Sequence, residues 1–131
     1  MKARVLAAVL ALLAPQGARA DWTLVGAEEG VFRAYADRDT IRRAGAGATM
    51  QGLYDFVRGD FTPDGRPLQS TRVHREYDCE GRRVRLMAHV DHEGRMGEGV
   101  AVATGRDPGR WEPVVAASLD ERFWTMACGV R

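Results

Sequence analysis

The chain has 131 residues, of which 45% are hydrophobic, and its 19 basic and 18 acidic side chains give a formal net charge of +1. That length accommodates a single globular domain. The near balance of charge argues against nucleic acid as a partner, because nucleic-acid-binding domains carry a marked excess of basic residues.

The first 20 residues have the layout of an export signal. Lys2 and Arg4 precede an uncharged apolar run, Val5–Ala14, which is shorter than the roughly 20 apolar residues that a membrane-spanning helix needs. We therefore interpret residues 1–20 as a cleaved signal peptide and residues 21–131 as one mature domain. No later segment is long and apolar enough for a transmembrane helix, so we expect the mature protein to be periplasmic, on the cell surface or secreted.

Short apolar and β-branched runs, separated by turn residues, predict a series of strands along the mature chain. The runs are Trp22–Val25, Val31–Ala36, Thr49–Val57, Leu68–Cys79, Arg82–Asp91 and Val100–Thr104. Pro63–Gly65 predicts a turn, because proline presets φ and glycine accepts a positive φ. Asp37 and Asp39 resemble a pair of carboxylates, but they are better interpreted as the start of a turn at Asp39–Thr40.

The fourth and fifth runs predict a hairpin whose two-residue turn is Glu80-Gly81, with Gly81 supplying the positive φ. Pairing Cys79 with Arg82 then sets the register of the ladder. On one apolar face it pairs Tyr77 with Val84, Val73 with Ala88 and Thr71 with Val90. On the opposite, solvent-facing side it pairs Asp78 with Arg83 and Glu76 with Arg85.

Two features of this hairpin bear on function. Arg75 falls opposite Leu86 on the apolar face, where it either lies at the rim or holds a buried acid. The solvent-facing side offers a candidate partner surface made of Arg72, His74, Arg83, Arg85, Met87 and His89. The alternative is that this side is only a solvated, charge-paired face.

A helix of about three turns is predicted at the end of the chain. Ser118 and Glu121 form a capping-box pattern, with Ser118 as the N-cap, and Gly129 can end the helix in a left-handed conformation. Residues at helical spacing form one apolar face: Leu119, Phe123, Met126 and Ala127. This face would pack against the sheet, although Cys128 points away from Leu119 on an ideal helix.

The chain has two cysteines, Cys79 and Cys128. Exported chains with two thiols usually join them, and Cys79 lies on the hairpin face that a covering helix would contact. We therefore predict a Cys79–Cys128 disulfide, worth about 4 kcal/mol on chain-entropy arguments. The alternative is two free thiols.

No residue pattern predicts catalysis. The chain has three histidines, His74, His89 and His92. Their spacing does not indicate a metal site, which needs three or four converging ligands. The chain has neither a G-x-S-x-G nor a phosphate-binding glycine motif, and its cysteines are too far apart for a C-x-x-C redox pair. Its tryptophans either form a binding stack or act as core and rim anchors: Trp22, Trp111 and Trp124. We predict no catalytic, cofactor-binding or metal-ligating residue, with a periplasmic enzyme or enzyme inhibitor as the alternative function.

Several local patterns, in their order and spacing, resemble the bacterial surface-adhesin protein E family. They are Trp22–Val25, Tyr35–Asp37 with Thr40–Arg43, Glu76–Cys79, Gly81–Leu86, Pro108–Val114 and Cys128. The resemblance implies an α+β fold: a single antiparallel sheet of about six strands, with a C-terminal helix held on its concave face by a disulfide. It also implies a non-catalytic binding module, whose partners are host extracellular-matrix proteins or envelope components and which can form a homodimer.

Overall fold

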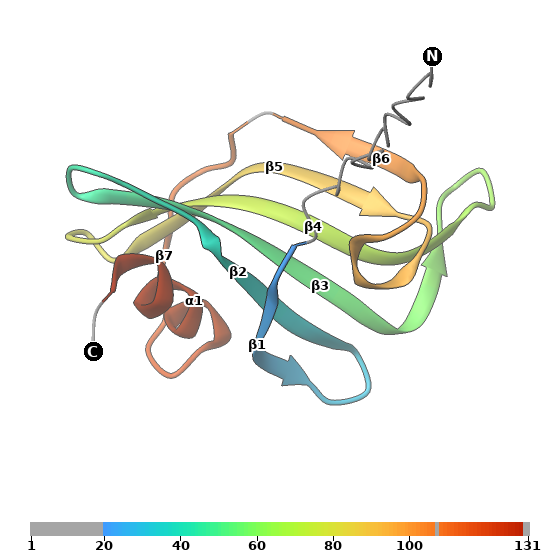
Figure 1. Cartoon of the computed structure of the whole chain (residues 1–131), viewed down its shortest axis with the longest axis horizontal. Helices are drawn as coiled ribbons and strands as arrows, with labels where there is room; N and C mark the ends of the chain where they lie inside the picture. The colour runs from blue at the N-terminus through green and yellow to red at the C-terminus, as the bar shows by residue number, and fades with distance from the viewer. Residues whose placement is uncertain (1–19, 107, 130–131) are drawn as a thin grey trace, which may run out of the picture.

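A computed structural model describes residues 20–106 and 108–129 of the chain. Residues 1–19 of the predicted signal peptide therefore lie outside the described residues. Figure 1 shows one twisted sheet with a single α-helix against one face. The elements are β1 (Trp22–Glu28), β2 (Phe32–Ala44), β3 (Gly47–Phe61), β4 (Pro67–Asp78), β5 (Arg83–His92), a 3₁₀ turn η1 (Arg95–Gly97), β6 (Ala101–Gly105), β7 (Glu112–Pro113) and α1 (Leu119–Cys128).

The sheet is an antiparallel meander in which β1 to β6 pair in sequence order. The two-residue strand β7 returns to pair with β5 at Arg83 and Val84. This confirms the predicted α+β class, with a single antiparallel sheet of six to seven strands and one C-terminal helix. All six predicted strands are present. β1 to β3 extend beyond the predicted runs because their ends are also held by neighbouring strands, whereas β4 has the predicted length and begins and ends one residue earlier.

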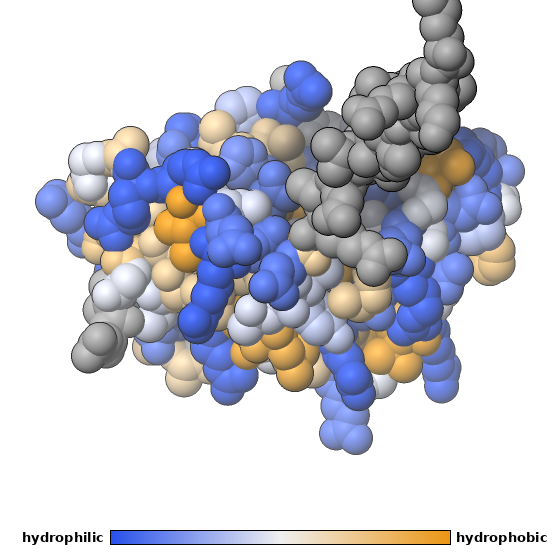
Figure 2. Space-filling view, in the orientation of Figure 1, coloured by the Kyte–Doolittle hydropathy of each residue, from blue (hydrophilic) through white to orange (hydrophobic). Residues whose placement is uncertain are grey.

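The core lies between α1 and the sheet face beneath it, which we call the helix face, while the surface seen from this side is mostly hydrophilic with smaller hydrophobic patches (Figure 2). Its largest fully buried side chains include Tyr77, Phe123 and Met50. Small residues of β2 and β3 make room for the helix: a Cβ at Gly52 would lie 3.1 Å from Val73 Cγ2 and 3.5 Å from Phe123 Cε1. Phe123 can therefore pack directly on the backbone of β3.

The predicted caps of α1 are present. Ser118 Oγ accepts a hydrogen bond from the Glu121 backbone N–H at 3.2 Å, while the Glu121 carboxylate accepts from Ala117 N–H at 3.3 Å. Gly129 ends the helix with φ of 67°. The reciprocal half of the capping box thus reaches one residue further back than the sequence pattern predicts.

The buried side of α1 is rotated from the predicted one. Its buried residues are Phe123, Trp124, Ala127 and Cys128, whereas Leu119 and Met126 are only partly buried. Two fixed contacts explain the rotation: Trp124 Nε1 donates to the Asp78 carbonyl at 2.8 Å, and Cys128 is bonded to Cys79.

The Cys79–Cys128 disulfide is present, as predicted, with 5.6 Å between the two Cα atoms. It links the β4–β5 turn to the last residue of α1, across a sequence separation of 49 residues. The Arg43 guanidinium donates a hydrogen bond to the Cys128 carbonyl and so satisfies an acceptor at the helix end.

The register of the β4–β5 hairpin is confirmed only near its turn. Pairing follows the prediction from Asp78–Arg83 to Arg75–Leu86. Met87 is then an extra residue on β5, so that Val73 faces His89 instead of Ala88 and Thr71 faces Asp91 instead of Val90. The predicted register is wrong beyond this point, because a one-residue bulge moves every later side chain to the other face.

The β4–β5 turn also differs from the prediction. The first paired residues are Asp78 and Arg83, so the connection has four residues, and its positive φ of 51° belongs to Arg82 instead of Gly81. Gly81 is required for space: a Cβ there would lie 2.4 Å from Asp78 Oδ2. The Asp78 carboxylate accepts the Gly81 N–H at 2.8 Å and organises the turn.

The other two turn predictions have different outcomes. The Pro63–Gly65 turn is confirmed, with φ of 83° at Gly65. The predicted turn at Asp39–Thr40 does not end the strand. Instead, Arg38–Ile41 form an insertion within β2, because β2 has four residues where β3 has only Met50.

Candidate functional site

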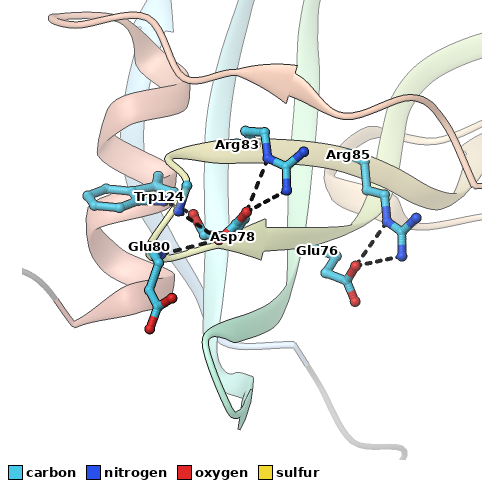
Figure 3. A network of polar contacts seen from close by, with 7 residues as sticks. Glu76, Asp78, Glu80, Arg83, Arg85 and Trp124 are labelled. Carbon is cyan, nitrogen blue, oxygen red and sulfur yellow. Dashed lines mark hydrogen bonds and ion pairs between the residues drawn. The ribbon is translucent and has the colours of Figure 1, made fainter.

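The sheet face opposite α1, which we call the outer face, carries the two predicted cross-strand ion pairs (Figure 3). Asp78 Oδ2 accepts from Arg83 Nε at 3.1 Å and from Nη2 at 2.8 Å. Glu76 Oε1 likewise receives Arg85 Nε at 2.9 Å and Nη2 at 2.7 Å. Each guanidinium thus donates from two of its nitrogens to one carboxylate oxygen, which fixes its plane against the sheet.

Trp111 completes this arrangement. Its ring centroid lies 5.0 Å from the Arg83 guanidinium carbon and 4.5 Å from that of Arg85. The residue directly precedes β7, whose pairing with β5 places the indole beside both arginines. Cation–π contacts of this kind add to the ion pairs in restricting the guanidinium planes.

An open depression of about 220 Å³ lies beside this cluster, over β4 and β5. The Met87 bulge pairs His74 with Ala88 and Arg72 with Val90, so small or branched apolar side chains stand beside long polar ones. The lining residues are Gln51, Arg72, Val73, His74, Ala88, His89 and Val90. The depression therefore combines an apolar floor with imidazole, guanidinium and amide groups.

The structure places four of the six predicted surface residues on the outer face: Arg72, His74, Arg83 and Arg85. The assignment of His89 to this face is wrong. His89 pairs with Val73, which belongs to the helix face, and the Thr71 Oγ1–Asp91 Oδ1 hydrogen bond of 2.8 Å confirms this register two residues further along. Val73 and His89 therefore border the depression from strand positions whose side chains alternate with those of the outer face. Met87 is the bulge residue itself and is half-buried.

A loop over the far end of the outer face covers polar side chains that the sequence analysis did not identify. Asp55 and Ser70 are 6% and 0% exposed. Asp55 accepts from Arg95 Nη2 at 3.1 Å and from the Met96 N–H at 2.9 Å, and Ser70 Oγ donates to the Gly94 carbonyl at 2.6 Å. An acid within an apolar strand was the only sequence signal of this contact.

The depression is anchored to this loop through a histidine. Arg72 Nε lies 3.0 Å from His92 Nε2, and His92 Nδ1 lies 3.2 Å from the Gly99 carbonyl. Because the Arg72 nitrogen can only donate, Nε2 is the acceptor and Nδ1 carries the proton. His92 is 5% exposed, so it positions Arg72 and offers little surface to a partner.

Arg75 lies on the helix face, and the structure decides between its two predicted roles. Its guanidinium carbon is 5.2 Å from the Tyr54 ring centroid and 5.7 Å from that of Phe123. Nη1 is 3.3 Å from Asp120 Oδ1, whose side chain is 45% exposed. Arg75 therefore stacks on aromatic rings and pairs with an acid at the rim. Burial raises the pKa of the Tyr77 phenol, although Arg75 acts in the opposite direction.

The described residues do not contain three His, Cys, Asp or Glu side chains arranged to hold a metal ion. Among these same residues, no helix is long and apolar enough to cross a membrane. The tryptophans do not share one role: Trp124 is 4% exposed in the core, and Trp111 stacks on arginines at the surface. The arrangement on the outer face presents planar cationic and aromatic groups, which suits recognition of a partner.

Comparison with known families matches residues 22–129 to surface-adhesin protein E. The fold resembles the crystal structure of protein E from non-typeable Haemophilus influenzae, with a TM-score of 0.66, 13% identity, and coverage of 88% of this chain and 80% of that chain. A second Haemophilus influenzae protein E structure gives a TM-score of 0.69 at 13% identity, covering 90% of this chain and 91% of that chain. A search of curated proteins gives no match.

Proposed function

The chain belongs to the surface-adhesin protein E family, and from that premise we propose that it is an exported, non-catalytic module that binds a protein of the cell envelope or of the host extracellular matrix. In this proposal residues 1–20 are a cleaved export signal and residues 21–131 form the binding domain. The observation that carries it is the outer face of β4 and β5, where Trp111 and two arginines adjoin an open depression.

The residue types on this face suit protein recognition. Tryptophan and arginine are enriched among the few residues that supply most of the binding energy at protein interfaces. Arg83 and Arg85 are already held by carboxylates and by Trp111. These arginines would therefore lose little side-chain entropy when a partner binds, which favours affinity.

The sheet edges are less suited to docking. β1 carries an extra residue, Val25, and β6 carries an extra residue, Val102, relative to the strands they pair with. Bulges in edge strands interrupt the row of free N–H and C=O groups that an added strand needs. We therefore assign partner binding to a sheet face, and the same reasoning applies to the homodimer that the family resemblance implies.

Site-directed cross-linking tests the proposal. A photoreactive amino acid at position 74 is used to capture partners from native envelope extract and, separately, from extracellular-matrix proteins, and each captured protein is purified for affinity measurements. We expect Trp111→Ala to weaken binding by about tenfold or more, which is about 1.4 kcal/mol. Val115→Ala is the control, because this 64% exposed apolar side chain lies in the loop before α1.

Equal weakening by both variants, or none by Trp111→Ala in a protein with unchanged thermal stability, would contradict the assignment to the outer face. Sedimentation analysis addresses the homodimer. A species that remains monomeric across the accessible concentration range would remove the second copy from the proposed partners.

A further inference from the structure

A second groove lies on the other side of the molecule, between α1 and the β2 insertion, with a volume of about 650 Å³. One wall is a stripe of α1 residues at spacings of three and four, Arg122, Thr125 and Met126, together with the C-cap Gly129. Arg38 and Ile41 of β2 form the opposite wall. Met126 is the member of this stripe that also packs against the hydrophobic core, whereas Arg122, Thr125 and Gly129 lie outside the buried side of α1.

The β2 wall is an ordered structure. The Asp37 carboxylate, whose residue is 6% exposed, accepts the Asp39 N–H at 3.0 Å. Thr40 Oγ1 donates to the Asp37 carbonyl at 2.6 Å and accepts the Gln51 N–H at 2.9 Å. The Thr40 hydroxyl thus satisfies a donor of β3 where the ladder is interrupted, and the insertion is held in place opposite α1.

The walls carry cationic groups above an apolar base. Ile41 and Met126 pack against the hydrophobic core. Arg38 and Arg122 are exposed, and within residues 20–106 and 108–129 neither forms an ion pair. Glu121 also lines the groove, but its carboxylate is 2.7 Å from Arg82 Nη2. Arg122 Nη1 also donates a long hydrogen bond of 3.5 Å to the Val25 carbonyl, which leaves its other guanidinium nitrogens, with the guanidinium of Arg38, to pair with an incoming anion.

We propose that this groove binds a short, extended acidic peptide segment of a partner protein. Carboxylate side chains would pair with Arg38 and Arg122, and a neighbouring apolar side chain would lie on Ile41 and Met126. From Arg122 to Gly129 the helix rises by about 10 Å, the length of about three extended residues. The carboxylate that pairs with Arg122 would lie toward the N-terminal half of α1. The other end of the groove, at Gly129, suits an uncharged residue, because the C-terminal end of a helix disfavours negative charge.

This inference does not depend on the outer-face site, and its test uses a different probe. The ¹⁵N-labelled mature chain, with its disulfide intact, is titrated with a five-residue peptide that alternates leucine with aspartate and glutamate. The reference peptide has asparagine and glutamine at the acidic positions. We expect chemical-shift changes at Thr125, Met126 and Ile41, and an affinity for the acidic peptide at least about tenfold above that for the reference.

Charge-reversal variants sharpen the test. Arg38→Glu and Arg122→Glu should each weaken binding of the acidic peptide by about tenfold or more, whereas Arg33→Glu should change it by less than about twofold. Arg33 is a matched control because it is an exposed arginine of β2 that pairs with Asp55 on the outer face, away from the groove. Arg38→Gln and Arg122→Gln repeat the measurement if a reversal prevents folding.

Three results would overturn the proposal: equal affinity for the acidic and reference peptides, equal weakening by Arg33→Glu, or shift changes confined to residues outside the groove. Displacement of the peptide by sodium oleate at a lower concentration than by the free acidic peptide would also overturn it, since the groove would then be selecting an anionic lipid. None of these results bears on the Trp111 measurement, so the two proposals can fail separately.

Discussion

At the scale of single residues, Arg75 shows how a charge is accommodated on the apolar helix face. Its side chain is 19% exposed and lies over Tyr54 and Phe123, with Asp120 at the rim. The aliphatic part of an arginine contributes packing as well as charge, and stacking on aromatic rings contributes more as the site becomes drier. The aromatic contacts should therefore matter more to stability than the ion pair.

We predict that Arg75→Ala lowers the free energy of unfolding by about 2 kcal/mol or more. Asp120→Ala should lower it by less than about 1 kcal/mol, because the ion pair is half exposed to solvent. Arg75→Lys should fall between them, since lysine keeps the charge and loses the planar stacking group. Urea denaturation measures all three. An Asp120→Ala effect as large as that of Arg75→Ala would contradict the argument.

Asp78 makes the stability depend on acid. Hydrogen bonds from the Gly81 N–H and from Arg83 hold the pKa of its carboxyl below the usual range. A carboxyl with a lower pKa in the folded state contributes stability above its unfolded pKa of about 4, and this contribution is lost as the pH falls through the folded value.

We therefore predict that Asp78→Asn reduces the acid dependence of stability below about pH 4. The measurement is the thermal midpoint of wild type and variant between pH 2 and about 7. Glu80→Gln serves as the control, because Glu80 supplies only its backbone N–H to Asp78, at 3.2 Å. The two variants should therefore differ. If the thermal midpoint falls equally with acidification in all three proteins, this role of Asp78 is refuted.

At the scale of elements, α1 is set by strong local signals. Ser118 and Gly129 mark its ends in the sequence and are its caps in the structure. The strands are less well determined locally: alternation predicts that β4 and β5 form a hairpin, but nothing around Met87 in the sequence marks it as a bulge. A bulge depends on how neighbouring strands fit together in the twisted sheet, so the residues of one strand do not predict it.

The N-cap gives a prediction at this scale. Ser118→Ala should lower the free energy of unfolding by about 1 kcal/mol, whereas Ser118→Gly should cost only a few tenths of a kcal/mol, because glycine leaves the terminal N–H groups open to water. Chemical denaturation of both variants tests the cap. If alanine and glycine cost the same, the Ser118 side chain does not stabilise the helix through capping.

At the scale of the whole molecule, the disulfide joins the helix to the sheet. Cys128 is the last residue of α1, and Cys79 follows β4 directly. The bond restricts the unfolded chain over a long loop, which chain-entropy arguments value at about 4 kcal/mol. That is a large part of the 5–15 kcal/mol typical of a small domain.

We predict that the double variant Cys79→Ser, Cys128→Ser loses about 4 kcal/mol of stability and that its helix exchanges amide hydrogens faster than the sheet does. Hydrogen-exchange mass spectrometry under native conditions compares Leu119–Cys128 with β3. Uniform faster exchange in both segments would indicate that the bond supports the whole fold equally and does not specifically retain the helix.

The sequence by itself determined the strand segments, the β4–β5 hairpin near its turn, the helix with its caps and the charge pairing of Arg83 and Arg85, because turns, caps and alternation depend on residues close in the chain. It also determined the cysteine pair, because the chain has two cysteines. Which residues come together at the two candidate sites was decided only by the tertiary structure. The Met87 bulge moved His89 off the outer face, the return of β7 brought Trp111 onto the arginines, and the β2 insertion set Arg38 opposite α1. These contacts join residues far apart in sequence, and their geometry depends on how the strands and helix fit together in the folded chain.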